Sequence, residues 1–487
     1  MATLQIALAL TGLVGASQPG ETGWAPLFDG KDLSGWSCEG DPKGWTVEDG
    51  VLVTTGKIDG GWLKTDREYG NFVLRIEYMI SGVGNSGIRI RSYRPDSVSP
   101  EVQILAPWTP TRDELHCTGS LYGHVAVSRR PDETPLAWHS MGIVCSGKDI
   151  RILVDGEVCT RANTDQVLTL KGLPPAGAIA LQSSHSGPDE WVKFRRISIR
   201  DLDQDPVYVG QALRSSDAAA RVSAQNRAAE IGAAMVPRLL ALYDEATPQA
   251  TRVARETLEW LVARASAREA ARGAVEQALD AEVDGAYSGE ARALAAGMLA
   301  FVGTDLSVAK LAGVLGDPVI RENALRSLIS IGGPQACRAL AESLGSLDDP
   351  GKLAVVVALG ALRDPDTVDA LTGEARDGAG PVRPAALRAL GAIGDARAAE
   401  TLVDASRSED SDVRRAAIDG MLALAERQGD RGLSALLFRR ASIPGATRGQ
   451  RMRALAGARD LGDEKLVEDL EQAARTLDPG TLDRLPR

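Results

Sequence analysis

The hydrophobic pattern of the chain changes near residue 205. Before that point, apolar and polar positions alternate with a period of two in short segments such as 72–80 and 150–154. Asp-Gly pairs at 49–50 and 155–156 follow two of these segments. Alternation of this kind, interrupted by Asp-Gly turns, is typical of antiparallel strands. We therefore predict an N-terminal antiparallel β-sandwich of the jelly-roll kind over residues 22–203.

The second half carries an internal repeat. The segment 383–395, RPAALRALGAIGD, is its clearest copy. Equivalent apolar positions recur at a constant spacing, at Leu325, Val356, Leu387 and Ile418. Two helices per repeat of about 30 residues are the pattern of an α-solenoid. The copies resemble HEAT repeats, and we predict an all-α HEAT-like solenoid over residues 210–487.

Composition places the candidate chemistry in the first half. Seven of the eight tryptophans and all four histidines precede residue 200. The net charge is −11, divided into −5 over residues 1–203 and −6 over the rest, and no stripe of Lys and Arg occurs. This argues against nucleic acid as a partner. Five cysteines without a CxxC pair argue against a disulfide scaffold and a thiolate zinc site.

The first residues resemble a secretory leader. An apolar run over residues 4–16 is followed by Ser17-Gln18-Pro19-Gly20, although residues 1–3 contain no Lys or Arg. This pattern predicts a signal peptide over residues 1–18 and export to the periplasm or the extracellular space. No other segment of the sequence stays apolar over the length that a membrane-spanning helix needs. We therefore expect no membrane span.

A series of motifs in the first half resembles one family, the 3-keto-disaccharide hydrolase domain. The series keeps its order and spacing from Pro26 to Ile197. Its members are PLFDGKDLSGW at 26–36, WTVEDGVL at 45–52, GNSGIRIR at 84–91, EVQIL at 101–105, TGSLYG at 118–123, IALQ at 179–182 and VKFRRI at 192–197. The resemblance implies a concanavalin-like sandwich that cleaves the glycosidic bond of a small carbohydrate substrate, a 3-keto-glycoside or 3-keto-disaccharide.

A 3-keto sugar can lose its aglycone by a route that an ordinary glycoside lacks. The ketone acidifies the proton on C2, so the aglycone leaves C1 by elimination, and addition of water completes the hydrolysis. This route needs a base near C2 and a cationic or hydrogen-bonding group at the enolate oxygen. An ordinary glycosidase instead needs two carboxylates flanking the bond.

Glu101 is the leading candidate for the base. Glu101 and Gln103 are two residues apart on one predicted strand, so their side chains share a face, while Val102 and Ile104 point to the core. Glu101 would act as the base or as a metal ligand. Gln103 would bind a sugar hydroxyl or complete a metal site. The competing interpretation is a solvated strand face.

The other candidate site residues belong to the same domain. His185 follows the last core strand and would act as the acid or as a metal ligand. Arg91 occupies the position where the family usually has arginine, and Arg89 faces the same side but is less typical. Either arginine would hold the ketone or enolate oxygen. His139 replaces an asparagine usual in the family. The predicted substrate-binding residues are Asn85, Arg91, Gln103, Tyr122, His139 and Gln182.

Each of these residues has a structural alternative. Asn85 would serve equally as a turn residue, Arg91 as half of a surface ion pair, and Tyr122 as a packing residue. Trp108 would be a sugar platform or part of the core. A divalent cation bound by oxygen and nitrogen ligands is open, because no compact metal motif occurs in the sequence.

Two other functions remain open. The sandwich would be a non-catalytic carbohydrate-binding module on a repeat scaffold, because one fold hosts many functions. Alternatively, both halves would bind proteins. The solenoid, which has no histidine, is expected to offer an interaction surface for a protein partner.

Overall fold

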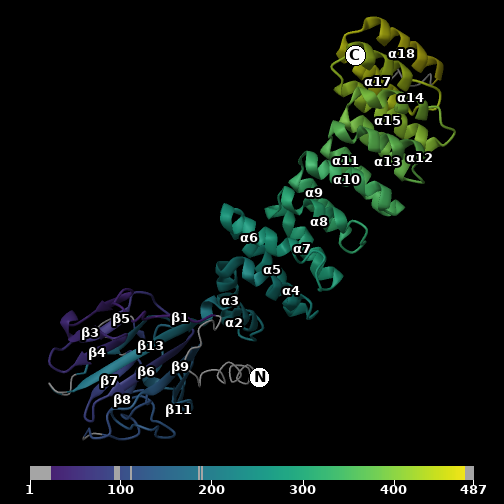
Figure 1. The fold of residues 1–487 in the computed structure, drawn as a ribbon. Coiled ribbons are helices and arrows are strands. Elements are labelled where there is room, and N and C mark those ends of the chain that lie inside the picture. Colours follow the sequence, from purple (N-terminus) through teal and green to yellow (C-terminus); the bar gives the residue numbers. More distant parts are fainter. Residues whose placement is uncertain (1–22, 93–98, 110–111, 185–186, 188–189, 478–487) are drawn as a thin grey trace. The chain divides into compact units, whose positions relative to one another are not determined.

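The protein is described by a computed structural model that covers residues 23–92, 99–109, 112–184, 187 and 190–477. The predicted signal peptide and His185 lie outside these described residues. The chain divides into two compact units, one ending at Gln211 and one beginning at Ala212. Figure 1 shows strands in the first unit and helices in the second. The predicted change from a β-sandwich to a helical repeat is confirmed.

The first unit consists of two antiparallel sheets. One has the strand order β11-β10-β9-β6-β13-β4-β3, with β1 also paired to β13, and the other has the order β2-β5-β12-β7-β8. The strands are β1 (Ala25–Pro26), β2 (Trp36–Cys38), β3 (Trp45–Glu48), β4 (Val51–Thr55), β5 (Trp62–Thr65), β6 (Phe72–Ile80), β7 (Asn85–Ser92), β8 (Glu101–Leu105), β9 (His139–Ser146), β10 (Asp149–Val154), β11 (Glu157–Asn163), β12 (Ala178–Gln182) and β13 (Trp191–Asp201).

The core of the sandwich lies between the two sheets. Alternate residues of each strand point inward, as the period of two requires. Ile88 and Val102 from one sheet and Leu74 and Ile143 from the other are fully buried in one apolar cluster. The opposite face of the five-stranded sheet is therefore free to carry polar side chains.

Short helical segments connect these strands and close the unit. They are η1 (Pro42–Gly44), η2 (Leu168–Leu170), η3 (Leu202–Gln204) and α2 (Pro206–Ala212). Tyr208 of α2 shares a hydrogen bond with Ser146 at 2.9 Å and packs on Val73 and Leu153. These contacts attach α2 to the outer face of the larger sheet.

The second unit is a stack of helices in chain order (Figure 1). They are α3 (Ala218–Ile231), η4 (Gly232–Met235), α4 (Val236–Tyr243), α5 (Pro248–Ser266), α6 (Glu269–Asp280), α7 (Gly289–Val302), α8 (Asp305–Gly313), α9 (Arg321–Ile331), α10 (Gly333–Ser343), η5 (Leu344–Ser346), α11 (Asp349–Leu362), η6 (Pro365–Thr367), α12 (Val368–Asp377), α13 (Val382–Ile393), η7 (Ala396–Ala398), α14 (Ala399–Ala405), α15 (Ser411–Arg427), α16 (Arg431–Ala441), α17 (Arg448–Leu461) and α18 (Glu464–Leu477).

The sequence repeat is visible in the packing. Leu325, Val356, Leu387 and Ile418 occupy equivalent buried positions on α9, α11, α13 and α15. Successive helices of this row approach closely: a Cβ added to Gly391 would lie only 2.4 Å from the carbonyl oxygen of Gly420. Helix α13 ends at Gly394, whose φ of +83° is the left-handed conformation that glycine adopts most readily. These features make each repeat one structural unit stacked on the next.

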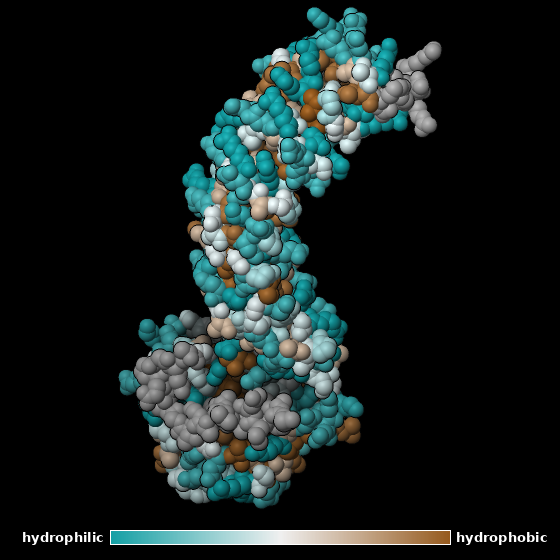
Figure 2. Space-filling view, turned by 90° about the vertical axis from the view of Figure 1, so that its right-hand side faces the viewer, coloured by the Kyte–Doolittle hydropathy of each residue, from teal (hydrophilic) through white to brown (hydrophobic). Residues whose placement is uncertain are grey.

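The surface of the solenoid is mainly hydrophilic. On the face that Figure 2 presents, apolar residues are scattered among polar ones. Among the described residues, no helix combines the length and the apolar character needed to cross a membrane.

Candidate functional site

Strands β7 and β8 place four residues on the outer face of the five-stranded sheet. Arg89 lies opposite Glu101, and Gly87 lies opposite Gln103. Residues that face each other across an antiparallel pair project to the same side. Glu101 and Gln103 therefore share a face, as predicted, while their neighbour Val102 is fully buried on the other side.

Strands β12 and β5 extend this face. Ala180 lies opposite Arg89 on β7, and Gln182 lies opposite Trp62 on β5. Gln182, two residues from Ala180, therefore projects from the same face as Arg89. The Arg89 guanidinium stacks over the Trp62 ring, 3.8 Å from its centroid. This contact holds the arginine in place by a cation–π interaction.

The Glu101 side chain lies over Gly87. A Cβ at position 87 would come 2.3 Å from Glu101 Oε1, so only glycine leaves room for the carboxyl group there. The side chain is 15% exposed, and Arg89 Nε is 3.9 Å from Oε2. This ion pair is too long for a hydrogen bond, and the carboxyl group accepts no hydrogen bond from the described residues.

Burial changes the ionisation of Glu101. Desolvation raises the pKa of its carboxyl group from an ordinary 4.5 to about 7, and the nearby Arg89 opposes the rise. A carboxyl group with a pKa near neutrality is well matched to accept a proton from carbon or to donate one to oxygen. The position thus has both the geometry and the proton affinity of an acid–base group.

Three buried polar atoms around Glu101 have no hydrogen-bond partner among the described residues. They are Oε1 of Gln103, Oε1 of Gln182 and Nε of Arg89. Gln103 is only 2% exposed, and its Nε2 donates to Asn85 Oδ1 at 3.3 Å. Buried polar groups are usually paired, so such a group of unpaired atoms indicates a place for a polar ligand. Two acceptors and one donor suit a molecule rich in hydroxyl groups.

Arg91, the arginine favoured by the sequence, lies elsewhere. The pairing of β7 with β12 shifts register between Ala178 and Ala180, and Arg91 has a φ of +52°. This irregularity turns its side chain off the outer face. Arg91 is buried, and its Nε donates to the Gly70 carbonyl at 2.9 Å. Arg89 is therefore the arginine beside Glu101, which corrects the preference for Arg91.

Tyr122 stands at the edge of the cluster. Its backbone N–H donates to the Glu101 carbonyl at 2.9 Å, and its side chain is exposed. The Tyr122 ring meets the His116 ring edge-on with centroids 4.9 Å apart, and His116 Nδ1 is 2.7 Å from Asp113 Oδ1. The Tyr122 ring thus packs on His116 and is also partly exposed, and its contact with substrate stays a prediction.

His139 is a buried structural residue. Its Nδ1 bonds to Asp155 Oδ2 at 2.7 Å, and its Nε2 bonds to the Thr134 carbonyl at 2.9 Å. Its ring packs on Tyr78 in the interior. Burial opposes the charged imidazolium, but the bonds to Asp155 and Thr134 hold the pKa of His139 above its ordinary value. Both ring nitrogens are therefore occupied, and the prediction that His139 contacts substrate finds no support in this placement.

Trp108 lies just beyond the end of β8 and is not a core residue. Its backbone N–H donates to the Gly82 carbonyl at 3.2 Å, and its ring lies where a side chain at Gly82 would be. The residue is 68% exposed. Trp108 is therefore outside the core, and its role as a sugar platform stays a prediction.

The cluster offers limited means to hold a metal. Among the described residues, no group of three or more His, Cys, Asp or Glu side chains is arranged to bind one. Glu101 is the one carboxylate of the cluster, and the amide oxygens of Gln103 and Gln182 are its neighbours on the face. The sequence left a divalent cation as an open alternative only, and the chemistry proposed below does not depend on one.

The sequence did not predict Trp62 as a member of this cluster, and it favoured Arg91 over Arg89. The signal for Arg89 and Gly87 is the period of two counted from Asn85, since residues 85, 87 and 89 share a face. Trp62 lies on a strand distant in sequence, and only the sheet order brings it beside Arg89.

Known families match both halves. Residues 23–200 match the 3-keto-alpha-glucoside-1,2-lyase-like domain, and residues 344–423 match HEAT repeats. A 3-keto-disaccharide hydrolase of Bacteroides thetaiotaomicron is 38% identical over 76 residues, which cover 14% of this chain and 26% of that protein. The chain thus spans about a quarter of the length of that curated relative. The resemblance read from the motifs is confirmed.

Solved structures resemble the first half. Two crystal structures named "putative glycosyl hydrolase" from Parabacteroides distasonis are 25% and 27% identical, each with a TM-score of 0.33. They cover 37% of this chain and are themselves covered to 94% and 98%. The carbohydrate-binding module CBM66 from Bacillus subtilis is 13% identical with a TM-score of 0.25, covering 35% of this chain and 97% of that module.

Proposed function

We propose that the sandwich, a 3-keto-alpha-glucoside-1,2-lyase-like domain followed by HEAT repeats, cleaves the glycosidic bond of 3-keto-glycosides and 3-keto-disaccharides by elimination and hydration. One observation carries the proposal. A carboxyl group with a pKa of about 7 lies within 3.9 Å of an arginine and beside unpaired amide oxygens on an open sheet face. A single base and a single cation are what the elimination requires.

In the first step, Glu101 takes the proton from C2 of the keto sugar. The electron pair of the C2–H bond forms a C2=C3 double bond, and the negative charge moves to the ketone oxygen. Arg89 is the cation beside Glu101, and its Nε has no hydrogen-bond partner among the described residues. We assign it to the enolate oxygen, where a preorganised donor stabilises the developing charge most.

In the second step, the enolate re-forms the ketone and expels the aglycone from C1. The bond between C1 and the glycosidic oxygen breaks, and that oxygen takes up one proton. His185 is the predicted donor, and protonated Glu101 and the Tyr122 phenol are alternatives. Water then adds across C1=C2, with hydroxyl at C1 and hydrogen at C2, so the net reaction is hydrolysis.

The polar neighbours would recognise the sugar. The oxygens of Gln103 and Gln182 accept hydrogen bonds from hydroxyl groups, and Asn85 holds the Gln103 amide in position. An acceptor that is buried and unpaired discriminates strongly against a ligand that lacks the matching hydroxyl. We therefore assign these two glutamines to substrate binding.

The test is aglycone release from an aryl 3-keto-glucoside by the full chain. We expect release by the wild type, none from the matching glucoside without the ketone, and a large loss in Glu101→Gln. Glu39→Gln is the matched control, because Glu39 lies on the same domain but pairs with Lys64 at 2.8 Å. No release by the wild type above Glu101→Gln would refute the proposal.

Carbohydrate binding without turnover is the second candidate, and the same preparation separates the two. If the wild type binds a 3-keto-glycoside by calorimetry but releases no aglycone, the sandwich is a binding module. If it releases aglycone, binding is a step of catalysis.

We further propose that the chain is exported. The proposal rests on the apolar run at residues 4–16 and on the small residues after it. Sequencing the N-terminus of protein recovered from cells tests it: removal of a leader near residue 18 supports export, and a retained N-terminus contradicts it.

A further inference from the structure

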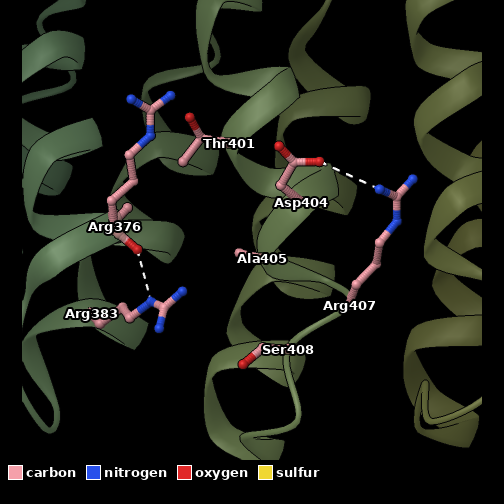
Figure 3. A pocket seen from close by; sticks show the side chains of 8 residues that line it. Arg376, Arg383, Thr401, Asp404, Ala405, Arg407 and Ser408 are labelled. Carbon is pink, nitrogen blue, oxygen red and sulfur yellow. Dashed lines mark hydrogen bonds and ion pairs between the residues drawn. The ribbon is translucent and has the colours of Figure 1, made fainter.

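A pocket of about 260 Å³ lies between two successive repeats of the solenoid. Figure 3 shows helices on both sides of it, with Arg376 and Arg383 on one side and Thr401, Ala405 and Ser408 on the other. The lining comes from the end of α12, the start of α13, α14 and the turn after α14. Its polar members are Arg376, Arg383, Thr401, Asp404, Arg407 and Ser408.

The lining carries three arginines and a single carboxylate. Asp404 is held by Arg407, with Nη1 and Oδ1 3.5 Å apart. Arg376 has no ion pair or hydrogen bond from its guanidinium to any described residue. The solenoid as a whole is acidic, so this excess of positive charge is local. A cation left unpaired beside a cavity is available to an anion.

Arg383 occupies a position that recurs in the repeat. Its equivalents in neighbouring repeats are Arg321, Lys352 and Arg414. In each of these three, the terminal nitrogen is engaged within the solenoid. Their partners are Asp348 Oδ1 at 2.9 Å for Arg321, Glu374 Oε1 at 2.9 Å for Lys352 and the Ser408 carbonyl at 2.6 Å for Arg414.

Arg383 departs from its equivalents. Its Nε donates to the Ala375 carbonyl at 2.9 Å, but its two terminal nitrogens make no hydrogen bond or ion pair with the described residues. Asp410, the counterpart of Asp348, accepts from Asp412 N and Val413 N at 2.8 and 3.2 Å, as Asp348 accepts from Gly351 N at 2.9 Å, but among the described residues no ion pair joins Asp410 to Arg383. Arg383 is thus present at the same repeat position as its equivalents, but its terminal nitrogens are left without a partner among the described residues, beside the pocket.

Two more features suit an anion. Arg376 and Arg407 occupy the same position in successive repeats, and in Figure 3 Arg376 lies on the side of Arg383 while Arg407 lies beyond Asp404. Thr401 and Ser408 add hydroxyl groups to the lining. Guanidinium groups bind oxyanions through pairs of parallel N–H donors. One such pair is enough for the two oxygens of a planar carboxylate. The terminal nitrogens of Arg376 and Arg383, unpaired among the described residues, offer more N–H donors than one planar carboxylate takes up, which suits the additional oxygens of a tetrahedral group.

We propose that this pocket binds a phosphate or sulfate group. Its volume of about 260 Å³ exceeds the roughly 30 Å³ that one water occupies in the liquid, so the group can enter with part of the molecule that carries it. The site is independent of the chemistry on the sandwich. Its occupation would place an anionic ligand on the repeat domain.

The test is calorimetric titration of the full chain with sodium phosphate and with sodium sulfate, at constant ionic strength set by chloride. We expect saturable binding by the wild type. The double variant Arg376→Gln/Arg407→Gln should bind at least about tenfold more weakly, because each charged hydrogen bond contributes on that order. Arg383 is left intact because it also caps α12 through Ala375.

Arg326→Gln is the matched control. Arg326 is an exposed arginine of α9 that pairs only with Glu322, at 3.5 Å. The Arg326→Gln variant should bind both anions as tightly as the wild type does. No saturable heat from either anion with the wild type, or equal binding by the double variant and the wild type, would overturn the proposal.

Parallel titrations show whether the bound phosphate or sulfate is a free ion or part of a larger molecule. Glucose 6-phosphate, glucose 6-sulfate and glucose are titrated in parallel with the inorganic ions. Tighter binding of one ester than of its free anion identifies the carried group, whereas tighter binding of the free ions identifies an inorganic ligand. Binding of glucose as strong as that of its esters contradicts the proposal.

Discussion

Each half of the molecule buries a glutamate, and the two are treated differently. In the solenoid, Glu276 is 2% exposed, and its Oε1 accepts from Thr304 N at 2.6 Å, Thr304 Oγ1 at 2.8 Å and Ser307 Oγ at 3.0 Å. In the sandwich, the one described partner of the Glu101 carboxyl group is Arg89, whose Nε lies 3.9 Å from Oε2. Glu276 accepts the hydrogen bonds that hold the start of α8 in place, whereas the Glu101 carboxyl group accepts no hydrogen bond that fixes an element of the described fold.

The difference separates structural from functional burial. A buried carboxylate that accepts several hydrogen bonds recovers what it lost by leaving water. A buried carboxylate without such hydrogen bonds destabilises the folded state, and groups of this kind are found most often at sites that act on a ligand. The contrast between the two glutamates therefore predicts opposite consequences when each is changed.

The largest expected effect is on turnover. Glu101→Gln removes the base but keeps the size of the side chain, and we expect kcat to fall about 10³- to 10⁴-fold, the usual contribution of a positioned base at its upper end. Aglycone release from an aryl 3-keto-glucoside measures it. A fall of less than tenfold would mean that Glu101 is not the base.

Arg89→Met should reduce kcat about 10²- to 10³-fold, the usual effect of removing one donor from a developing oxyanion. Because Arg89 lowers the pKa of Glu101, the variant should also move the acidic limb of the pH–rate profile to higher pH. Arg91→Met is the control, since Arg91 bonds to Gly70. It should lower stability and leave that limb where it is.

Stability should reveal the cost of burying Glu101. The pKa of its carboxyl group is about 7 in the folded protein against an ordinary 4.5, so between these values the folded chain holds a proton that the unfolded chain has lost. The free energy of unfolding therefore falls as pH rises from 4.5 to 7, by about 3 kcal/mol in total.

Glu101→Gln cannot ionise, so it should escape this loss. We expect the variant to be more stable than the wild type at pH 8 by up to about 3 kcal/mol and nearly equal to it at pH 4. Urea unfolding followed by tryptophan fluorescence measures this, because seven of the eight tryptophans precede residue 200. A variant less stable than the wild type at pH 8 would contradict the comparison.

The smallest effect concerns Glu276. Glu276→Ala leaves Thr304 and Ser307 without their acceptor, and we expect the solenoid to lose about 2 kcal/mol of unfolding free energy, in the range for unpaired buried donors. Urea unfolding followed by helical circular dichroism measures it. Aglycone release should be unchanged, and a loss of activity would show that the two halves are not separable in this way.

Periodicity predicted much of this arrangement. The period of two placed Glu101 and Gln103 on one face and Val102 in the core, and the constant step of the repeat found the buried row of the solenoid. These predictions succeed because side-chain direction follows directly from regular backbone geometry.

The rest depends on irregularity and on contacts between distant strands. Arg91 was misplaced because the left-handed backbone at that residue breaks the alternation. His139 was expected to bind substrate because it replaces an asparagine usual in the family, but Asp155 and Thr134 hold it in the interior. Neither feature has a signature in the order of residue types.

The most direct test of Glu101 as an unsatisfied base is hydrogen exchange at C2 of a 3-keto-glucoside in deuterated water, followed by NMR as a function of pH. The account predicts exchange that rises through a midpoint near the pKa of about 7 in the wild type and is lost in Glu101→Gln. Exchange that persists in Glu101→Gln, or a midpoint near the ordinary 4.5, would contradict it.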